Sequence, residues 1–264
     1  MPEQAVWAAV GALGLIVGSF LNVCIHRLPL RQSVVHPRSR CAACAAPIAW
    51  YDNIPLLSYL LLRGRCRGCR ARISWVYPAV EAVNAGAYLA LYARWGAAPA
   101  LAVLAAFVSA LIALVMIDAR HQILPDRITL PMLGLGLATS GINPEVTWSG
   151  SIAGAVLGAA APAALLLLWQ WCFGIEGMGW GDVKMLAMIG SFLGPGRAAV
   201  TLLAGACLGA AVGVGMMAAR RGTLRTALPF GVFLGLAAAG ALGWGAPVVG
   251  WYAQRLAAAG WPPW

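Results

Sequence analysis

Long stretches without a single charged residue recur along this chain, and they constrain its fold more than any other feature. A transmembrane helix needs roughly 20 consecutive apolar residues. Of the 264 residues, 61% are hydrophobic and only 10% are charged, which is too little polar surface to cover a soluble domain. The sequence therefore predicts an all-α polytopic membrane protein. Five charge-free windows have the required length: 4–25, 95–117, 146–175, 198–219 and 226–254.

Three shorter apolar stretches, 77–92 (which contains Glu81), 128–142 and 183–194, bring the expected number of transmembrane helices to about eight. The N-terminus lacks the basic region of a cleavable signal peptide, so we expect the first stretch to be retained. The predicted organisation has four parts. These are a first transmembrane helix (1–26), a small cytoplasmic insert (27–76), a transmembrane core (77–256) and a short C-terminal tail (257–264).

The positive charges are unevenly distributed, although the net charge is +10. Nine of the 18 basic residues lie between 27 and 72, and others cluster around Arg120, Lys184 and Arg220. Alternating spans would place all of these segments on one side of the membrane, and cytoplasmic loops are the ones that collect Arg and Lys. The charge thus marks the cytoplasmic side of a protein embedded in the lipid bilayer, and we do not expect nucleic acid as a partner.

Four cysteines in the insert form two CxxC pairs, Cys41 with Cys44 and Cys66 with Cys69. This spacing is close to that of a zinc ribbon, in which each pair supplies two thiolates to one tetrahedral ion. Such a site has no open coordination position, so zinc would stabilise a segment too short for its own core. Two disulfides or a redox role are the alternatives, although a cytoplasmic location argues against stable disulfides.

Two of the eight carboxylates lie at one predicted membrane face: Asp118 follows the window 95–117, and Asp182 precedes the stretch 183–194. Two adjacent aspartates can share one proton and act together as general acid and base, as in aspartic proteases. The alternatives are a helix cap formed by Asp182, or a surface ion pair between Asp118 and Arg120 or Lys184. Asp126 follows a proline and is predicted to be an N-cap.

Several ordered motifs resemble those of one family, the type IV prepilin peptidases, over roughly residues 11–235. The motifs are GSFLNV at 18–23 with RLP at 27–29, the two CxxC pairs, NIPLLSY at 53–59 with RG at 63–64, YP at 77–78 with Glu81, Asp118 followed by LPD at 124–126, and GWGDVK at 179–184.

The resemblance implies a bifunctional enzyme of the bacterial inner membrane, serving type IV pili or type II secretion, with Asp118 and Asp182 as its catalytic pair. The GxGD motif around Asp182 is shared with other intramembrane aspartyl proteases. The implied substrates are prepilins or pseudopilins, cleaved after a glycine at the cytoplasmic face. The new N-terminal residue would then be methylated from S-adenosylmethionine, for which no stretch of the sequence suggests a pocket.

Two other classes of function are compatible with some of these features. A transporter or channel could use the aspartates as proton or cation sites, but it would predict an inverted repeat and polar residues near the bilayer midplane. A membrane scaffold could use the cysteine insert to bind a partner. The carboxylates lie at the ends of predicted spans, and no convincing repeat is evident in the sequence.

Overall fold

The computed structural model describes residues 2–174, 179–221, 223 and 227–258, and over these residues the chain is helical, with two isolated β-bridges and no named strand. The chain divides into two compact units, residues 1–113 and 114–264. The predicted all-α membrane fold is confirmed.

Unit 1 is built on the close pairing of α1 (Glu3–Arg27) with α3 (Val76–Trp95). A Cβ at Gly14 of α1 would lie 2.6 Å from the Cα of Ala85 on α3, so only glycine permits this approach. The buried Asn84 side chain donates to the Gly14 carbonyl oxygen at 2.7 Å and accepts from the Ser109 hydroxyl at 2.9 Å. Polar contacts of this kind join helices where hydrophobicity alone cannot drive their association.

The insert between α1 and α3 contains little regular structure. It holds a short 3₁₀ helix, η1 (Trp50–Asn53), and a five-residue helix, α2 (Leu57–Leu61). The first part of α4 (Pro99–His121) completes unit 1, and the rest of α4 belongs to unit 2.

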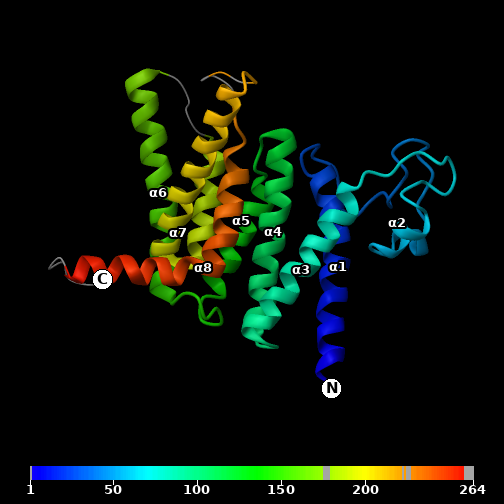
Figure 1. Cartoon of the computed structure of the whole chain (residues 1–264), viewed down its shortest axis with the longest axis horizontal. Helices are drawn as coiled ribbons and strands as arrows, with labels where there is room; N and C mark the ends of the chain where they lie inside the picture. The colour runs from blue at the N-terminus through cyan, green and yellow to red at the C-terminus, as the bar shows by residue number, and fades with distance from the viewer. Residues whose placement is uncertain (1, 175–178, 222, 224–226, 259–264) are drawn as a thin grey trace. The chain divides into compact units, whose positions relative to one another are not determined.

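Unit 2 continues with α5 (Asp126–Ala138), α6 (Trp148–Phe173), α7 (Trp180–Ala218) and α8 (Phe230–Ala258), as Figure 1 shows. Helix α7 packs against α5, α6 and α8. Its first half is almost entirely buried: Met185, Met188, Ile189 and Phe192 are all inaccessible to solvent. Helix α7, which carries Asp182 in its first turn, is thus the centre of this unit.

Helix α7 is interrupted at Gly194, whose φ of 79° and ψ of 174° are not helical and favour glycine. Pro195 follows and cannot donate a backbone hydrogen bond. Met185, before the break, lies against Gly235 of α8, whereas Gly205, after the break, lies against the neighbouring Leu234. The chain therefore folds back on itself at Gly194, which separates the predicted stretches 183–194 and 198–219.

Within the part of the chain that the structure describes, five helices are long and apolar enough to cross a membrane: α1, α4, α6, α7 and α8. The shorter predicted stretches 77–92 and 128–142 correspond to α3 and α5. The total of eight spans and the four-part division of the chain stay predictions. Residues 259–264 of the predicted tail lie outside the described residues.

The contact between α6 and α7 leads to a first testable prediction. A Cβ at Gly190 would collide with the backbone of Gly154, whereas a Cβ at Gly134 of α5 would meet nothing within 4 Å. We expect Gly190→Ala to destabilise the protein by about 1–3 kcal/mol, because the two backbones must separate. Thermal unfolding of the detergent-solubilised protein measures this effect, with Gly134→Ala as the matched control. Equal midpoints for the two variants would contradict the close packing.

Candidate active site and metal centre

Asp118 lies three residues before the end of α4 and is 5% exposed. Its Oδ2 accepts the backbone N–H of Val232 at 3.1 Å, and the N–H of Gly231 also faces this carboxylate. Both residues belong to the first turn of α8, where backbone N–H groups have no partner within the helix and the helix dipole is positive. Asp118 is therefore held in a fixed orientation by the N-terminus of α8.

Asp182 is the third residue of α7 and is 9% exposed. Its N–H donates to the Gly179 carbonyl oxygen at 3.1 Å, and its carboxylate accepts from the backbone of Gly179. The alternative prediction that Asp182 is a helix cap is therefore only partly correct. Gly179 is the N-cap residue, and the carboxylate of Asp182, in the first turn, accepts the N–H of Gly179.

Leu124, in the turn between α4 and α5, lies next to a glycine beside each aspartate. Its side chain packs against Gly231, beside Asp118, and against Gly181, beside Asp182. The charge of Asp118 acts on the carboxylate of Asp182. Unit 2 thus places two buried carboxylates at one end of its helices, an arrangement suited to shared acid-base chemistry.

The ion pairs in this region differ from those considered from the sequence. Lys184 binds both carboxylate oxygens of Asp126 at 2.8 Å, and Asp118 forms no ion pair among the described residues. The prediction that Asp126 is an N-cap is wrong: Pro125 is the N-cap of α5, and Asp126 is the first residue of the helix. Over the described residues of α5, the Asp126 carboxylate caps no N–H group, and it pairs with Lys184 instead.

The four insert cysteines, Cys41, Cys44, Cys66 and Cys69, form the candidate metal centre. Their sulfur atoms lie within 4.8 Å of one another, and the Sγ atoms of Cys41 and Cys69 are 3.8 Å apart. A tetrahedral zinc ion with Zn–S bonds of about 2.3 Å separates its sulfur ligands by about 3.8 Å, so the group fits zinc.

The two cysteine turns have the same backbone geometry. Cys41 donates to Ala46 and Cys66 donates to Ala71, each at 2.9 Å, and an antiparallel bridge closes each turn. Each CxxC pair is therefore one copy of a repeated loop that presents two thiols to the same point, as a zinc ribbon does.

Backbone amides prepare one of these thiols for a metal. Hydrogen bonds from the N–H groups of Cys44 and Ala43 lower the pKa of Cys41 to about 6. The N–H of Ala71 acts in the same direction on Cys69, but hydrogen bonding to Cys44 and the other thiols outweighs it and raises the pKa of Cys69 to about 11. Cys41 is therefore favoured as a thiolate and Cys69 as a thiol, and metal binding must release the proton of Cys69.

Glu81, the carboxylate predicted inside an apolar stretch, has a partner in unit 1. It is 8% exposed, and its Oε2 accepts the backbone N–H of Leu56 at 2.9 Å. Leu56 has a φ of +57°, unusual for leucine, and directly precedes α2. Glu81 thus attaches the insert to α3.

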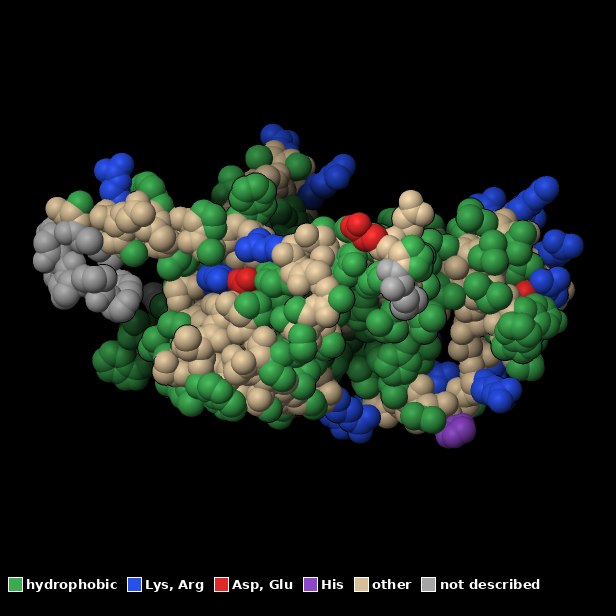
Figure 2. Space-filling view, turned by 90° about the horizontal axis from the view of Figure 1, so that it is seen from below, with side chains coloured by type: hydrophobic (Ala, Val, Ile, Leu, Met, Phe, Trp, Pro, Cys, Tyr) green, Lys and Arg blue, Asp and Glu red, His purple; other side chains and the backbone are tan. Residues whose placement is uncertain are grey.

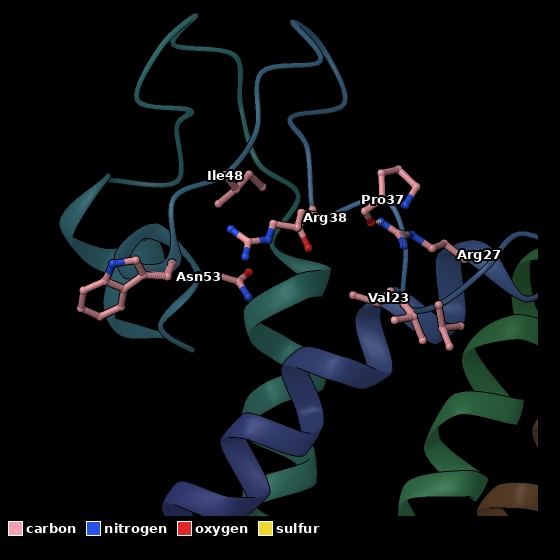
Figure 3. A pocket seen from close by; sticks show the side chains of 10 residues that line it. Val23, Arg27, Pro37, Arg38, Ile48 and Asn53 are labelled. Carbon is pink, nitrogen blue, oxygen red and sulfur yellow. Dashed lines mark hydrogen bonds between the residues drawn. The ribbon is translucent and has the colours of Figure 1, made fainter.

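A hollow of about 400 Å³ opens between the end of α1 and the insert (Figure 3). Arg27, which lines the hollow, donates to the carbonyl oxygens of Ser33 and Pro37 at 3.0 and 2.8 Å. Arg38 lies between Ile48 and Asn53. Two arginines and no carboxylate line this hollow. It therefore offers no carboxylate to pair with the sulfonium cation of S-adenosylmethionine, and no residues are assigned to the methyl donor.

These features define a class: an integral membrane protein with a buried aspartate pair and a cysteine-rich insert. Residues 12–95 match the bacterial peptidase A24 N-terminal domain, and residues 105–214 match the type IV leader peptidase family. The chain belongs to the type IV leader peptidase family, as its motifs predicted.

Three relatives are each named prepilin leader peptidase/N-methyltransferase. That of Pseudomonas putida is 37% identical over 255 residues, covering 88% of both chains. The Aeromonas hydrophila relative is 37% identical over 93% of both chains, and that of Burkholderia pseudomallei strain 1026b is 39% identical over 89% of this chain and 84% of its own. No solved structure gives a significant match.

Two residues of the candidate site are not indicated by any motif in the sequence. Gly231 and Val232 provide the N–H groups that hold Asp118, yet they lie more than 110 residues further along the chain. Pro229 marks a helix start in the sequence, which is the only local signal of free N–H groups at this position. Nothing in the sequence indicates which carboxylate they meet.

Proposed function

We propose that this protein is an integral-membrane aspartyl endopeptidase that removes the leader of prepilins or pseudopilins and methylates the new N-terminal residue. The observation that carries the proposal is the buried pair Asp118 and Asp182 at one end of unit 2, in a chain of the type IV leader peptidase family. The names of the relatives support both the peptidase and the methyltransferase activity.

The chemistry of cleavage requires two carboxylates that share one proton. The ionised carboxylate takes a proton from water as the water oxygen attacks the scissile carbonyl carbon. The protonated carboxylate donates its proton to the amide nitrogen, which leaves as an amine when the C–N bond breaks. The N–H groups of Gly231 and Val232 orient Asp118, so the geometry of the pair is set before substrate arrives.

The position of the pair favours a peptidase over an ion transporter. A transporter binds its ion near the bilayer midplane. Asp118 is three residues from the end of α4, and Asp182 is the third residue of α7. Carboxylates at helix ends are instead placed to meet a scissile bond at the membrane surface.

The remaining assignments complete the proposal. The enzyme lies in the bacterial inner membrane with the active site at the cytoplasmic face, and it cleaves after a glycine that follows a short basic leader. Residues 77–256 form the peptidase core, and residues 27–76 form an insert in which Cys41, Cys44, Cys66 and Cys69 hold a structural zinc ion. S-adenosylmethionine supplies the methyl group when it is bound.

One experiment tests both activities together. Purified protein in detergent or nanodiscs is incubated with a candidate prepilin and isotopically labelled S-adenosylmethionine, and mass spectrometry reads the N-terminus of the product. We expect loss of the leader and one labelled methyl group on the new N-terminal residue. An intact prepilin under conditions where the protein remains folded would contradict the peptidase assignment.

The contact between Gly231 and Asp118 predicts a selective loss of activity. A Cβ at Gly231 would lie 2.9 Å from Oδ2 of Asp118, whereas a Cβ at Gly240 of the same helix would meet nothing within 4 Å. We expect Gly231→Ala to lower the rate of leader cleavage by about 10²-fold, because the carboxylate must move. Gly240→Ala is the matched control, and thermal unfolding reports the fold of both. An unchanged rate in Gly231→Ala would show that this N-terminal turn does not position Asp118.

A further inference from the structure

The insert carries an apolar surface on α2. Leu57, Leu60 and Leu61 are 50%, 70% and 73% exposed. Their spacing of three and four residues puts them on one side of the helix, and we call these three residues the α2 face. Adjacent exposed leucines form an apolar patch, and such a patch marks a surface that contacts lipid or another molecule.

The depth of α2 is set by its attachment to α3. Leu56, just before α2, donates its backbone N–H to Glu81, the sixth residue of α3. The backbone of Glu81 in turn packs against Gly18 of α1, because a Cβ at Gly18 would lie 2.7 Å from the Glu81 Cα. Gly18 is nine residues before Arg27, the last residue of α1, or about 14 Å along the helix axis. Helix α2 therefore begins beside the span of α1, as Figure 1 also shows, and not beyond its end.

Basic side chains adjoin the α2 face. Arg63, Arg65 and Arg70 are exposed and line, together with Leu61, a hollow of about 620 Å³. Arg67 lies in the same hollow but is paired with Asp52 at 2.7 Å, whereas the other three arginines have no acidic partner among the described residues. Figure 2 shows basic and hydrophobic side chains intermingled at the right of the molecule, where Figure 1 places the insert.

We propose that α2 is an interfacial helix, whose leucine face enters the leaflet at the Arg27 end of α1 while Arg63, Arg65 and Arg70 bind the phosphate groups of acidic phospholipids. Apolar residues beside guanidinium groups match the acyl and phosphate layers of a bilayer, one above the other. A free phosphate would satisfy the arginines but leave the leucines in water. The bilayer satisfies both, and α2 already lies beside a membrane-spanning helix.

Photocrosslinking tests the location of the α2 face. Benzoylphenylalanine replaces Leu60 in the full chain, which is placed in nanodiscs of equal phosphatidylglycerol and phosphatidylcholine and irradiated. Leu13 of α1, 54% exposed, is the lipid-facing control position, and Ala42, exposed between two metal-site cysteines, is the control away from lipid. We expect lipid adducts at position 60 as at position 13, none at position 42, and several-fold more phosphatidylglycerol than phosphatidylcholine at position 60.

A charge variant separates the headgroup contact from simple proximity to lipid. Combining Arg63→Gln, Arg65→Gln and Arg70→Gln should bring the ratio of the two lipids at position 60 close to one, while total adducts persist. Removing three exposed charges outside the insert, with Arg120→Gln, Arg127→Gln and Arg221→Gln, should leave the ratio unchanged. Retained zinc content shows that the insert is folded in each variant, and Leu57 replaces Leu60 as the probe position if zinc is lost.

Two results would overturn the proposal. Adducts at position 60 to protein alone, whether to this chain or to an added prepilin, would mean that a protein surface covers the α2 face. An absence of lipid adducts at position 60 while position 13 is labelled would place α2 in water. The readout does not depend on peptidase activity, so its failure would leave the proposed function untouched.

Discussion

Replacing Asp118 or Asp182 with asparagine is expected to abolish leader cleavage, with a loss of at least about 10³-fold in rate. Asparagine keeps the size of the side chain and can still accept the N–H of Val232 or Gly179. It cannot take up a proton from water or donate one as an acid, so the chemical step fails while the fold persists. Mass spectrometry of a prepilin substrate measures cleavage, and the amount of membrane-inserted protein reports folding.

Asp126→Asn is the matched control for this pair, because Asp126 lies close to the same helix ends. Its ion pair with Lys184 is exposed, with side chains that are 52% and 37% accessible. Exposed pairs contribute about 0–1 kcal/mol, so this variant should cleave at nearly the normal rate. Normal cleavage by Asp118→Asn or by Asp182→Asn would rule out the aspartate pair as the catalytic group.

Loss of zinc is expected to unfold the insert. Cys41→Ser combined with Cys44→Ser removes one of the two cysteine turns, and structural zinc sites contribute about 10–16 kcal/mol of apparent binding energy. A segment of about 50 residues with few buried side chains cannot offset that loss. We expect no stoichiometric zinc by metal analysis and rapid proteolysis within residues 27–76.

Two other cysteines provide the matched control for the zinc experiment. Cys172 and Cys207 are exposed and lie outside the cluster. Cys172→Ser combined with Cys207→Ser should retain zinc and protease resistance. Protein that resists proteolysis without stoichiometric metal would instead support disulfides in the insert.

The sequence predicted the helices well where hydrophobicity decides them. The apolar stretches 4–25 and 146–175 correspond to α1 and α6 within a few residues, because burial in lipid requires long runs without charge. The interruption between 183–194 and 198–219 was also evident from the sequence. The sequence did not indicate that the chain folds back at this point, because the fold-back is evident only from the contacts of Met185 and Gly205 with α8.

The candidate site was predictable in its residue types but not in its contacts. Motif spacing singled out Asp118, Asp182 and the four cysteines, since acid-base and zinc chemistry require those side chains. Local sequence rules failed for Asp126: they made it a helix cap, whereas its partner is Lys184, 58 residues away. Asp118 likewise meets Val232, 114 residues away.

The sequence alone therefore determined that this protein is an all-helical membrane protein and the family to which it belongs, and it supplied the candidates for its chemistry. These properties follow from composition, short spacing and ordered motifs. Only the tertiary structure decided that the N-terminus of α8 holds Asp118, that Leu124 packs against both Gly231 and Gly181, and that Glu81 holds the residue before α2. Such contacts join residues that are distant in the chain, and helix packing selects them through shape and hydrogen bonding that no local pattern records.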